Sequence, residues 1–137
     1  HHQPRRQRQM CIRDSGCHLG QKDMDILKAK KILKNKIIGV TCHNSIKLAK
    51  YASSNGANYI ALGAFYKTRT KKVIHKADIK TLNKIKKSVK IPVVAIGGIN
   101  HKNYKKLLLN KADFLAISGY IWNNKKFKPH QAIKNLI

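Results

Sequence analysis

Asp23 is the acidic residue best suited to chemistry in this chain. It ends the stretch His18-Leu-Gly-Gln-Lys-Asp23, and it is one of five acidic residues, against 30 Lys and Arg. A carboxylate that follows a strand can supply a hard oxygen ligand to Mg²⁺. A carboxylate that begins a helix can instead cap that helix or interact with its dipole. The sequence leaves both roles open for Asp23.

Hydroxyl, imidazole and ammonium groups make up two further clusters. Thr41 and His43 emerge together from Gly39-Val-Thr-Cys-His43, where a lone histidine is usually structural. In Thr68-Arg-Thr-Lys71, two hydroxyls and an ammonium group are spaced to point the same way from one loop. Such groups suit phosphate or pyrophosphate oxygens. Lysine is so abundant in this chain that the second cluster is not specific by itself.

Two turns built from small residues form the last cluster. Ile91-Pro-Val-Val-Ala-Ile-Gly-Gly-Ile99 contains a Gly-Gly pair, and Ala116-Ile-Ser-Gly119 ends in a Ser-Gly pair. Turns without bulky side chains allow backbone N–H groups to approach a phosphate closely. Both turns also have a conformational explanation, because tight turns need glycine. Their order matches the phosphate site that barrels form after strands seven and eight, which favours phosphate binding.

These clusters follow short apolar runs that alternate with lysine-rich amphipathic segments. The runs predict strands at Cys17–Leu19, Ile37–Thr41, Tyr59–Leu62, Val93–Ile96 and Phe114–Ile117. Strands that are apolar on both faces and alternate with helices predict a parallel sheet with right-handed crossovers. An open doubly wound sheet would fit this alternation equally well. The polar residues directly after each strand favour a (β/α)8 barrel, whose sites lie at the C-terminal ends of the strands.

The amphipathic segments predict helices at about Asp23–Leu33, Ser45–Ser54, Ile79–Val89, Lys102–Leu109 and His130–Leu136. Asn44, Asp78 and Asn100 stand where N-cap residues are expected. Gly56 stands where a left-handed residue is expected to end a helix. The face of the second helix that is predicted to pack on the sheet carries Ile46, Ala49 and Ala52. Its lysines lie elsewhere and are predicted to be solvated.

The charge of the chain raises a different class of function, a basic nucleic-acid-binding module. A formal net charge of +25 with no glutamate is typical of nucleic-acid-binding proteins. The lysines are, however, spread over every predicted helix and accompany many Asn and Ile residues. The chain has no RNA-binding aromatic motif and no helix-turn-helix signature. We therefore interpret the charge as a compositional bias and expect no nucleic-acid partner.

Hydropathy and cysteine usage predict where the protein works. No apolar run approaches the roughly 18 residues that a membrane span requires, so no membrane association is expected. The three cysteines, Cys11, Cys17 and Cys42, are odd in number and show no CxxC or CxxH spacing. This argues against a disulfide framework and against a zinc site, and it predicts a cytoplasmic protein.

The first 15 residues differ in composition from the rest. Four of the five arginines lie in residues 1–15, and the remaining chain holds only Arg69. No apolar core follows the basic residues, as a targeting peptide would require. The string Met10-Cys-Ile-Arg-Asp-Ser15 looks like a translated sequencing adapter. We therefore interpret residues 1–15 as a non-native, disordered segment and residues 16–137 as the folded domain.

From Gly16 to the C-terminus, the motifs in their order and spacing resemble the thiamine phosphate synthase family. The segments that carry the resemblance are Gly16–Asp23, Ile38–His43, Ala57–Gly63, Thr68–Lys71, Pro92–Ile99 and Ala112–Asp113. The resemblance implies a transferase that joins 4-amino-2-methyl-5-hydroxymethylpyrimidine diphosphate to a thiazole phosphate and releases pyrophosphate. It also implies an α/β fold, the (β/α)8 TIM barrel. This chain would form only the C-terminal portion of that barrel, from about strand 4 or 5 to strand 8. A complete barrel needs roughly 200 residues or more.

The resemblance implies roles for the motif residues toward the diphosphate. Asp23 matches a Mg²⁺ ligand in the family's GQxD motif, and Thr41 stands where the family usually has a serine that contacts the diphosphate. Lys71 matches the lysine that binds the diphosphate. The implied Mg²⁺ and Lys71 stabilise the departing pyrophosphate, so that the pyrimidine releases a benzylic-type cation, which the thiazole nitrogen captures. Positioning and electrostatic stabilisation then supply most of the catalysis.

The thiazole phosphate has its own implied contacts. They are Thr68 and Thr70 in the TxT loop, Gly98 through its backbone, and Ser118 and Gly119 after the last strand. Arg69, which lies between the two threonines, is also expected to bind substrate. The family normally has that last serine one position later, and it usually has proline where Ala64 stands. The sister family of thiazole tautomerases shares the fold and a histidine at the position of His43. Tautomerases tend to lose the GQxD acid and the TxTK loop, and this chain keeps both, so the synthase is favoured.

Part of the family pattern is missing from this chain. The early Gln-x-Arg-x-Lys segment and the Asn-Asp pair, which supplies a second Mg²⁺ ligand, belong to the first three βα units. Half a barrel would leave a bare parallel sheet edge and an open core. We therefore expect the 137-residue chain alone to be inactive and poorly soluble.

Overall fold

Five short apolar runs form the strands of one parallel sheet. The computed structural model describes residues 15–67 and 76–137. In these ranges the strands are β1 (Gly16–Leu19), β2 (Ile37–His43), β3 (Tyr59–Leu62), β4 (Val93–Ile96) and β5 (Phe114–Ala116). They lie in the order β1-β2-β3-β4-β5, and every neighbouring pair is parallel. The predicted strands are confirmed: β3 and β4 have the predicted bounds, and the other three differ at one end by one or two residues.

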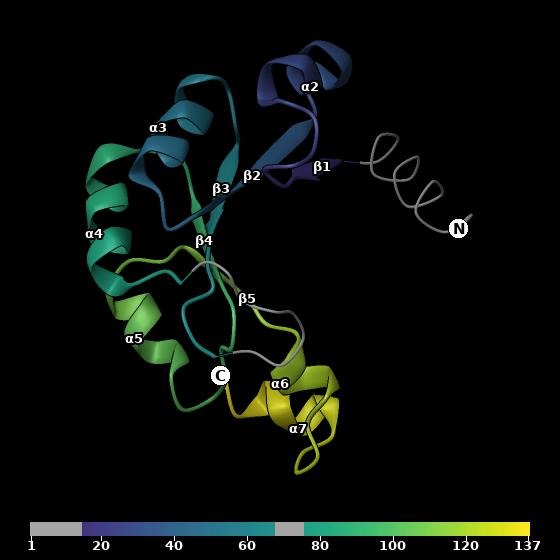
Figure 1. Ribbon diagram of the computed structural model, residues 1–137. Helices are drawn as coiled ribbons and strands as arrows, with labels where there is room; N and C mark the ends of the chain where they lie inside the picture. Colours follow the sequence, from purple (N-terminus) through teal and green to yellow (C-terminus); the bar gives the residue numbers. More distant parts are fainter. Residues whose placement is uncertain (1–14, 68–75) are drawn as a thin grey trace.

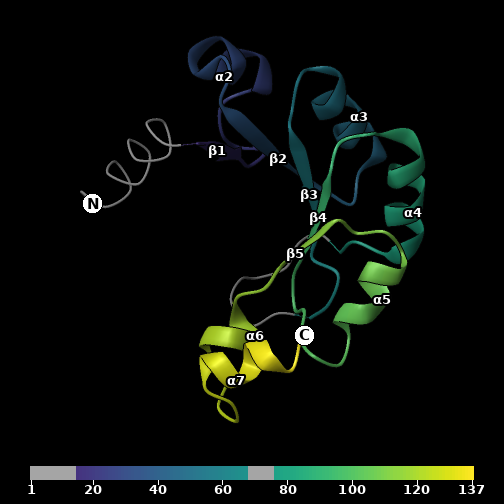
Figure 2. The same cartoon turned by 180° about the vertical axis from the view of Figure 1, so that it is seen from behind.

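The strand order and the helix positions distinguish between the two parallel architectures. In a doubly wound sheet the strand order reverses and helices cover both faces. Here the order follows the sequence. The helices α3 (Ile46–Ser54), α4 (Ile79–Ser88) and α5 (Tyr104–Leu109) lie on the same side of the sheet in opposed views (Figures 1 and 2). This is the arrangement of consecutive βα units in a barrel, so the doubly wound alternative does not fit.

Helix α3 begins one residue later than predicted and has a different N-cap. The Ser45 side chain accepts a hydrogen bond from the Leu48 N–H at 3.1 Å. Asn44, the predicted cap, accepts instead from the Asp78 N–H at 3.2 Å. Asn44 therefore joins the end of β2 to the start of α4 rather than capping its own helix. Gly56, which follows α3, has a φ of 92°, as predicted for the residue that ends this helix.

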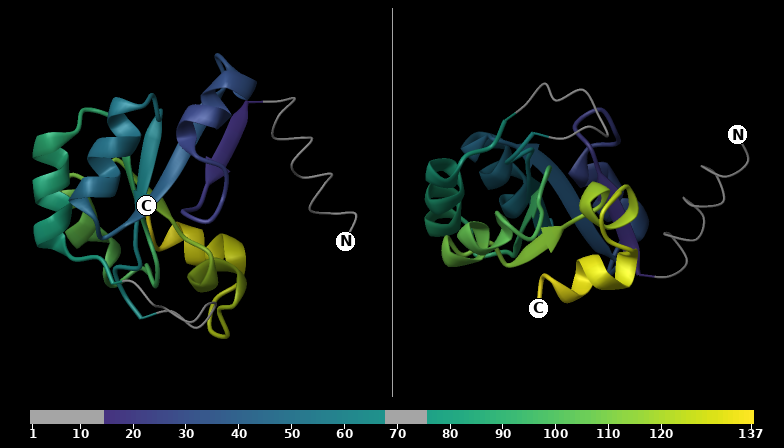
Figure 3. Two further views of the ribbon diagram at one scale, coloured as in Figure 1. Left: turned by 45° about the horizontal axis from the view of Figure 1, so that its top comes forward. Right: turned by 90° about the horizontal axis from the view of Figure 1, so that it is seen from below.

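The C-terminal helices also differ from the sequence prediction. Helix α5 begins at Tyr104, and the predicted cap Asn100 lies in the preceding turn, where its side chain accepts from the N–H groups of Lys102 and Asn103. A short helix, α6 (Gly119–Trp122), was not predicted, and α7 (Pro129–Lys134) ends earlier than expected. The yellow segments in Figure 3 show α6 and α7 side by side after β5. Helix α6 is too short to give a helical apolar pattern.

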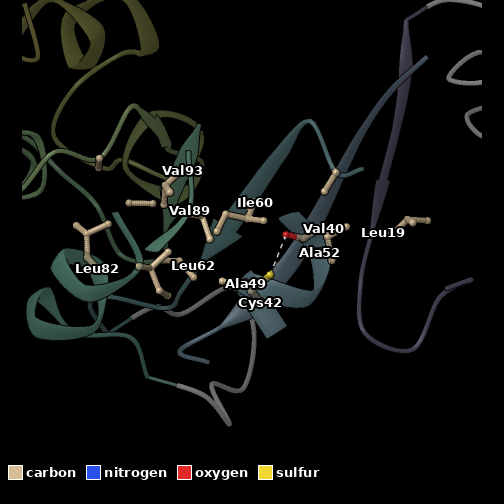
Figure 4. Packing of buried hydrophobic residues seen from close by; sticks show 14 of the residues in the cluster. Leu19, Val40, Cys42, Ala49, Ala52, Ile60, Leu62, Leu82, Val89 and Val93 are labelled. Carbon is tan, nitrogen blue, oxygen red and sulfur yellow. Dashed lines mark hydrogen bonds between the residues drawn. The ribbon is translucent and has the colours of Figure 1, made fainter. Parts of the chain in front are cut away.

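The hydrophobic core lies between the sheet and the helices. Ile38, Ile60 and Val93, from three neighbouring strands, are fully buried. They belong to one cluster with Ala49 and Ala52 of α3, which are also fully buried, so the predicted apolar face of this helix is confirmed (Figure 4). Small side chains on α3 allow the helix to approach the sheet closely.

Cys42 belongs to this core rather than to the site. It is fully buried, and its thiol donates a hydrogen bond to the Val40 carbonyl at 3.6 Å (Figure 4). Burial raises the pKa of the Cys42 thiol to about 12. The thiol therefore stays protonated at neutral pH and acts as a small apolar side chain.

The opposite face of the sheet is only partly covered by the described residues. Side chains alternate between the two faces along a strand. Ile37 and Phe114, which point away from the core, are 50% and 59% exposed. Together with Tyr59, Pro92 and Val94 they line a shallow apolar hollow near the amino ends of the strands. In a complete barrel, layers of side chains fill this interior.

Helix α4 allows a test of capping. The Thr81 N–H donates to Asp78 Oδ1 at 2.7 Å, which confirms the predicted N-cap, and this hydrogen bond lowers the pKa of Asp78. The resulting stabilisation is present above the carboxyl's unfolded pKa and is lost as the pH falls through the folded pKa. We expect Asp78→Ala to lower the free energy of unfolding by about 1 kcal/mol at neutral pH and less in acid. Denaturant unfolding at both pH values measures this, and Asp78→Asn, which keeps a cap, is the control. Unchanged stability of Asp78→Ala would contradict the prediction.

Candidate active site at the carboxyl ends of the strands

Parallel pairing brings the carboxyl ends of the strands to one edge of the sheet. The predicted site residues in the described ranges all lie at this edge, in the turn after β1, at the end of β2, and after β4 and β5: Asp23, Thr41, Gly98, Ser118 and Gly119. The other predicted site residues lie outside the described residues, in the segment that follows β3: Thr68, Arg69, Thr70 and Lys71.

Asp23 closes the turn that follows β1. Its Oδ2 accepts a hydrogen bond from the Gly20 N–H at 2.8 Å, and its own N–H donates to the Gly20 carbonyl at 3.1 Å. Asp25 caps α2 (Ile26–Leu33), because its side chain accepts from the Leu27 N–H at 3.1 Å. The prediction that a helix begins at Asp23 is therefore wrong, and so is the interpretation of Asp23 as a helix cap.

The second carboxylate oxygen of Asp23 is the atom suited to a metal ion. Within the described ranges, Oδ1 receives no protein hydrogen bond, and the side chain is exposed. Mg²⁺ often keeps several waters and binds one or two carboxylates together with substrate phosphates. The described residues contain no group of three or more His, Cys, Asp or Glu that could hold a metal. Asp23 therefore fits Mg²⁺ as a single ligand and not as part of a complete protein cage.

Thr41 is held through both its side chain and its backbone. His18 Nε2 lies 2.7 Å from Thr41 Oγ1, and the Gln21 side-chain amide donates to the Thr41 carbonyl. On the other side of the imidazole, His18 Nδ1 lies 2.9 Å from the Tyr59 hydroxyl. Thr41 was predicted from the sequence, whereas no role was predicted for His18 or Tyr59. A signal was present, since His18 and Thr41 alternate with apolar residues along their strands.

The local environment sets the protonation of these groups. Desolvation lowers the pKa of His18, and the charge of the Asp23 carboxylate acts in the opposite direction. Desolvation also raises the pKa of Tyr59. At neutral pH we therefore expect a neutral imidazole beside a protonated phenol.

His43 occupies an irregular end of β2. The pairing of β2 with β3 shifts between Thr41 and His43, and His43 has a φ of 51°. Such a bulge changes the direction in which a side chain leaves the strand. Thr41 and His43 were predicted to emerge together from the end of the strand. The structure places an irregularity of β2 between them.

Gly97 and Gly98 form a turn that packs against the chain leaving β3. Both have positive φ, 105° and 64°. A Cβ on Gly98 would lie 2.5 Å from the Lys67 carbonyl oxygen, and the Tyr66 N–H donates to the Gly97 carbonyl at 3.0 Å. The positive φ angles and the close backbone are therefore enough to explain why both positions are glycine. The same turn is also compatible with backbone contacts to a phosphate.

The two glycines of the predicted phosphate site give a matched pair of substitutions. We expect Gly98→Ala to destabilise the fold by about 1–3 kcal/mol, because both the positive φ and the nearby backbone oppose a side chain. For Gly119, at the start of α6, nothing lies within 4 Å of an added Cβ. Gly119→Ala is therefore expected to leave the melting temperature within about 2 °C of the unsubstituted value. Thermal unfolding measures both, and equal melting temperatures for the two variants would contradict this account.

Comparison with known proteins decides the family. The profile described as thiamine monophosphate synthase matches residues 10–121. A thiamine-phosphate synthase from Pelagibacter ubique is 69% identical over 121 residues, which are 88% of this chain and 58% of that protein. The chain belongs to the thiamine monophosphate synthase family. Another family relative, the thiamine-phosphate synthase of Clostridium acetobutylicum, is 43% identical over 87% of this chain and 56% of its own length.

Solved structures agree with the family at the level of the fold. A thiamine phosphate pyrophosphorylase from Pyrococcus furiosus is 35% identical and superposes with a TM-score of 0.78, over 90% of this chain and 57% of that chain. A 3-hexulose-6-phosphate synthase superposes with a TM-score of 0.62 at 18% identity, which shows the fold alone. This member of the thiamine monophosphate synthase family thus spans less than two thirds of the length of these relatives.

The predictions of a non-native N-terminal segment and of no membrane span can be compared with the structure only for the described residues. Residues 1–14 of the predicted non-native segment lie outside them, and the family match begins at residue 10. The carbonyl of Ser15, the last residue of that segment, accepts a hydrogen bond from the Ile37 N–H at 2.9 Å, so Ser15 contacts the first residue of β2 although it lies just outside β1. In the described part of this family member, no helix has the length and apolar character needed to cross a bilayer.

Proposed function

We propose that residues 16–137 form part of a thiamine phosphate synthase. The enzyme would join 4-amino-2-methyl-5-hydroxymethylpyrimidine diphosphate to a thiazole phosphate, giving thiamine phosphate and pyrophosphate. The observation that carries the proposal is the 69% identity to the Pelagibacter ubique synthase over 121 residues. The position of Asp23, Thr41 and Gly98 at the carboxyl edge of the sheet supports it, because barrel enzymes act at that edge. The chain would supply about strands 4 or 5 to 8 of the barrel.

The diphosphate is the group on which catalysis acts in this proposal. As it leaves, negative charge grows on its oxygens, and fixed donors in the site stabilise that charge. The Thr41 hydroxyl and the Lys71 ammonium group are the proposed catalytic contacts. Thr41 is well suited to this role, since His18 and Gln21 fix its hydroxyl and its carbonyl. The site also holds the pyrimidine and the thiazole in contact, which replaces a bimolecular encounter by a positioned reaction.

The thiazole phosphate is proposed to bind on the neighbouring side of the site. Its contacts would come from hydroxyl, guanidinium and backbone groups: Thr68, Arg69, Thr70, Gly98, Ser118 and Gly119. The open space beside Gly119 supports this assignment, because a phosphate could reach the backbone there without a steric clash. The substrates are small anions, and neither a nucleic acid nor a membrane takes part. A cytoplasmic location remains part of the proposal and follows from the cysteine pattern.

Asp23 is the residue proposed to hold Mg²⁺. Its Oδ1, which accepts no hydrogen bond from the described residues, would be one ligand, with water and diphosphate oxygens as the others. Bound there, the ion would neutralise charge on the leaving pyrophosphate. The hydrogen bond from Gly20 to Oδ2 supports this role, because it orients the carboxylate without occupying Oδ1.

The proposal is tested with a hybrid synthase, defined as the Pelagibacter ubique protein in which the matching segment is replaced by residues 16–137. We expect it to form thiamine phosphate and pyrophosphate when Mg²⁺ is present. Thr41→Val should lower kcat/KM by about 10- to 100-fold through loss of a hydrogen bond to a charged group, whereas Thr41→Ser keeps the hydroxyl. The 137-residue chain alone should show no turnover. An inactive hybrid synthase beside an active parent would overturn the proposal.

A further inference from the structure

Three side chains from neighbouring strands form a hydrogen-bonded row on the partly covered face of the sheet. They are Tyr59 on β3, His18 on β1 and Thr41 on β2. The Tyr59 hydroxyl lies 2.9 Å from His18 Nδ1, and His18 Nε2 lies 2.7 Å from Thr41 Oγ1. The imidazole and phenol rings are stacked, with centroids 5.5 Å apart and planes inclined by 27°. Both imidazole nitrogens therefore have a defined partner.

Gly39 makes this row possible. In the parallel register, His18 lies beside Gly39 and Gly39 lies beside Tyr59. Tyr59 is thus two strands away from His18 and has to reach across β2. A Cβ on Gly39 would lie 1.9 Å from the Tyr59 ring, so the ring occupies the space that a side chain at position 39 would fill. The row therefore depends on a backbone position without a side chain.

The direction of the hydrogen bonds depends on which imidazole nitrogen carries the proton. The Tyr59 phenol stays protonated because desolvation raises its pKa, and desolvation lowers the pKa of His18 and favours the neutral ring. A neutral imidazole donates from one nitrogen and accepts at the other. If Tyr59 donates to Nδ1, then Nε2 carries the proton and donates to Thr41 Oγ1. The Thr41 hydroxyl is then free to donate its own proton to another acceptor.

We infer that His18 is a positioning residue that, held by Tyr59, fixes the Thr41 hydroxyl as a hydrogen-bond donor to the diphosphate of the substrate. This inference rests on the proposed function, which places the diphosphate at Thr41. The Gln21 amide, which donates to the Thr41 carbonyl, fixes the backbone of the same residue. His18 itself does not touch the reacting atoms. Its effect passes through Thr41.

The first experiment compares two replacements of His18 in the hybrid synthase. The glutamine side-chain amide can take the place of Nε2, so His18→Gln keeps a donor to Thr41. The asparagine amide reaches only the place of Nδ1, so His18→Asn loses that donor. We expect His18→Asn to lower kcat/KM by about 10-fold and His18→Gln by about threefold or less, the size of one hydrogen bond. Equal losses for the two variants would overturn the positioning role.

A double-mutant cycle tests whether His18 acts through Thr41. In the Thr41→Val background the hydroxyl is absent, so His18→Asn is expected to have no further effect on kcat/KM. Residues that act independently would show the full effect of each replacement in the double variant. An additive double variant would overturn the inference. The affinity of each variant for inorganic pyrophosphate, measured by calorimetry with Mg²⁺, should follow the same pattern, because pyrophosphate shares the diphosphate contacts.

Nitrogen NMR of ¹⁵N-histidine-labelled hybrid synthase reports the tautomer directly. We expect His18, assigned by its loss in His18→Asn, to carry its proton on Nε2. Tyr59→Phe removes the donor to Nδ1 and should mix the two tautomers. The matched control is Tyr51→Phe, which removes a phenol that donates to Asp25 Oδ1 at 3.0 Å and should leave the His18 signal unchanged. A proton on Nδ1 of His18 would overturn the inference. A correct tautomer in an inactive hybrid synthase would instead locate the failure in the proposed function.

Discussion

Asn in place of Asp23 is expected to lower kcat/KM of the hybrid synthase by about 10²–10³-fold, because stabilisation of the leaving diphosphate is lost. The Asp23 carboxylate uses Oδ2 to accept from the Gly20 N–H and leaves Oδ1 for a ligand. An asparagine amide has one acceptor oxygen, so it can satisfy either the turn or a metal ion, but not both. The loss should be largest at low Mg²⁺ concentration. Initial rates over a range of Mg²⁺ concentrations measure it.

Asp25 supplies a control two residues away on the same segment. Its carboxylate caps α2 and accepts from the Tyr51 hydroxyl, and it faces the helix side of the sheet. Asparagine is as good an N-cap as aspartate, so Asp25→Asn should keep kcat/KM within about twofold. The net charge of the two variants is the same. Equal activity in the Asp23 and Asp25 variants would exclude a specific role for the Asp23 carboxylate.

Alanine in place of Leu62 is expected to lower the free energy of unfolding of the hybrid synthase by about 2–5 kcal/mol. Leu62 ends β3, is fully buried and belongs to the cluster between the sheet and the helices (Figure 4). Removing its side chain loses apolar burial and leaves a cavity, because interiors are close-packed and relax only partly. Denaturant unfolding followed by circular dichroism measures the change.

Leu109→Ala is the matched control for this core substitution. The same atoms are removed, but Leu109 lies at the end of α5 and is 82% exposed. Its removal should change the free energy of unfolding by about 0.5 kcal/mol or less. A similar decrease in the free energy of unfolding for both variants would contradict the prediction, which rests on the difference in burial between Leu62 and Leu109. The Asp23→Asn variant, in contrast, should lose activity while its unfolding stays nearly unchanged, so the two kinds of defect can be told apart.

The parallel sheet explains why the candidate residues in the described ranges could be placed at one edge from the sequence. Polar residues that follow successive strands meet at one edge in any parallel sheet, so Asp23 and Thr41 could be grouped without knowledge of the strand order. The local role of Asp23 was not predictable in the same way. Asp23 and Asp25 are two acids on the same short segment, and which one caps α2 depends on where the chain leaves the Gly20 turn.

The row formed by Tyr59, His18 and Thr41 was beyond the reach of sequence patterns. His18 and Tyr59 are 41 positions apart, and they meet because β1 and β3 flank the same glycine of β2. Their contact depends on the register of two strand pairs at once. Hydrophobic periodicity identifies which face of a strand a residue occupies, but it does not fix which residues lie opposite each other.

The strands, most of the helices, the core face of α3 and the sheet edge that carries the candidate site residues could be predicted from the sequence alone. These follow from short-range patterns, namely apolar periodicity, capping residues and the direction of parallel strands. The lateral neighbours became visible only in the folded chain: Gly39 lies under the Tyr59 ring, His18 lies beside Thr41, and Asp23 lies in a turn rather than a helix. Those contacts depend on register and on the absence of a side chain at one position. Both are properties of the packed sheet and not of any single segment.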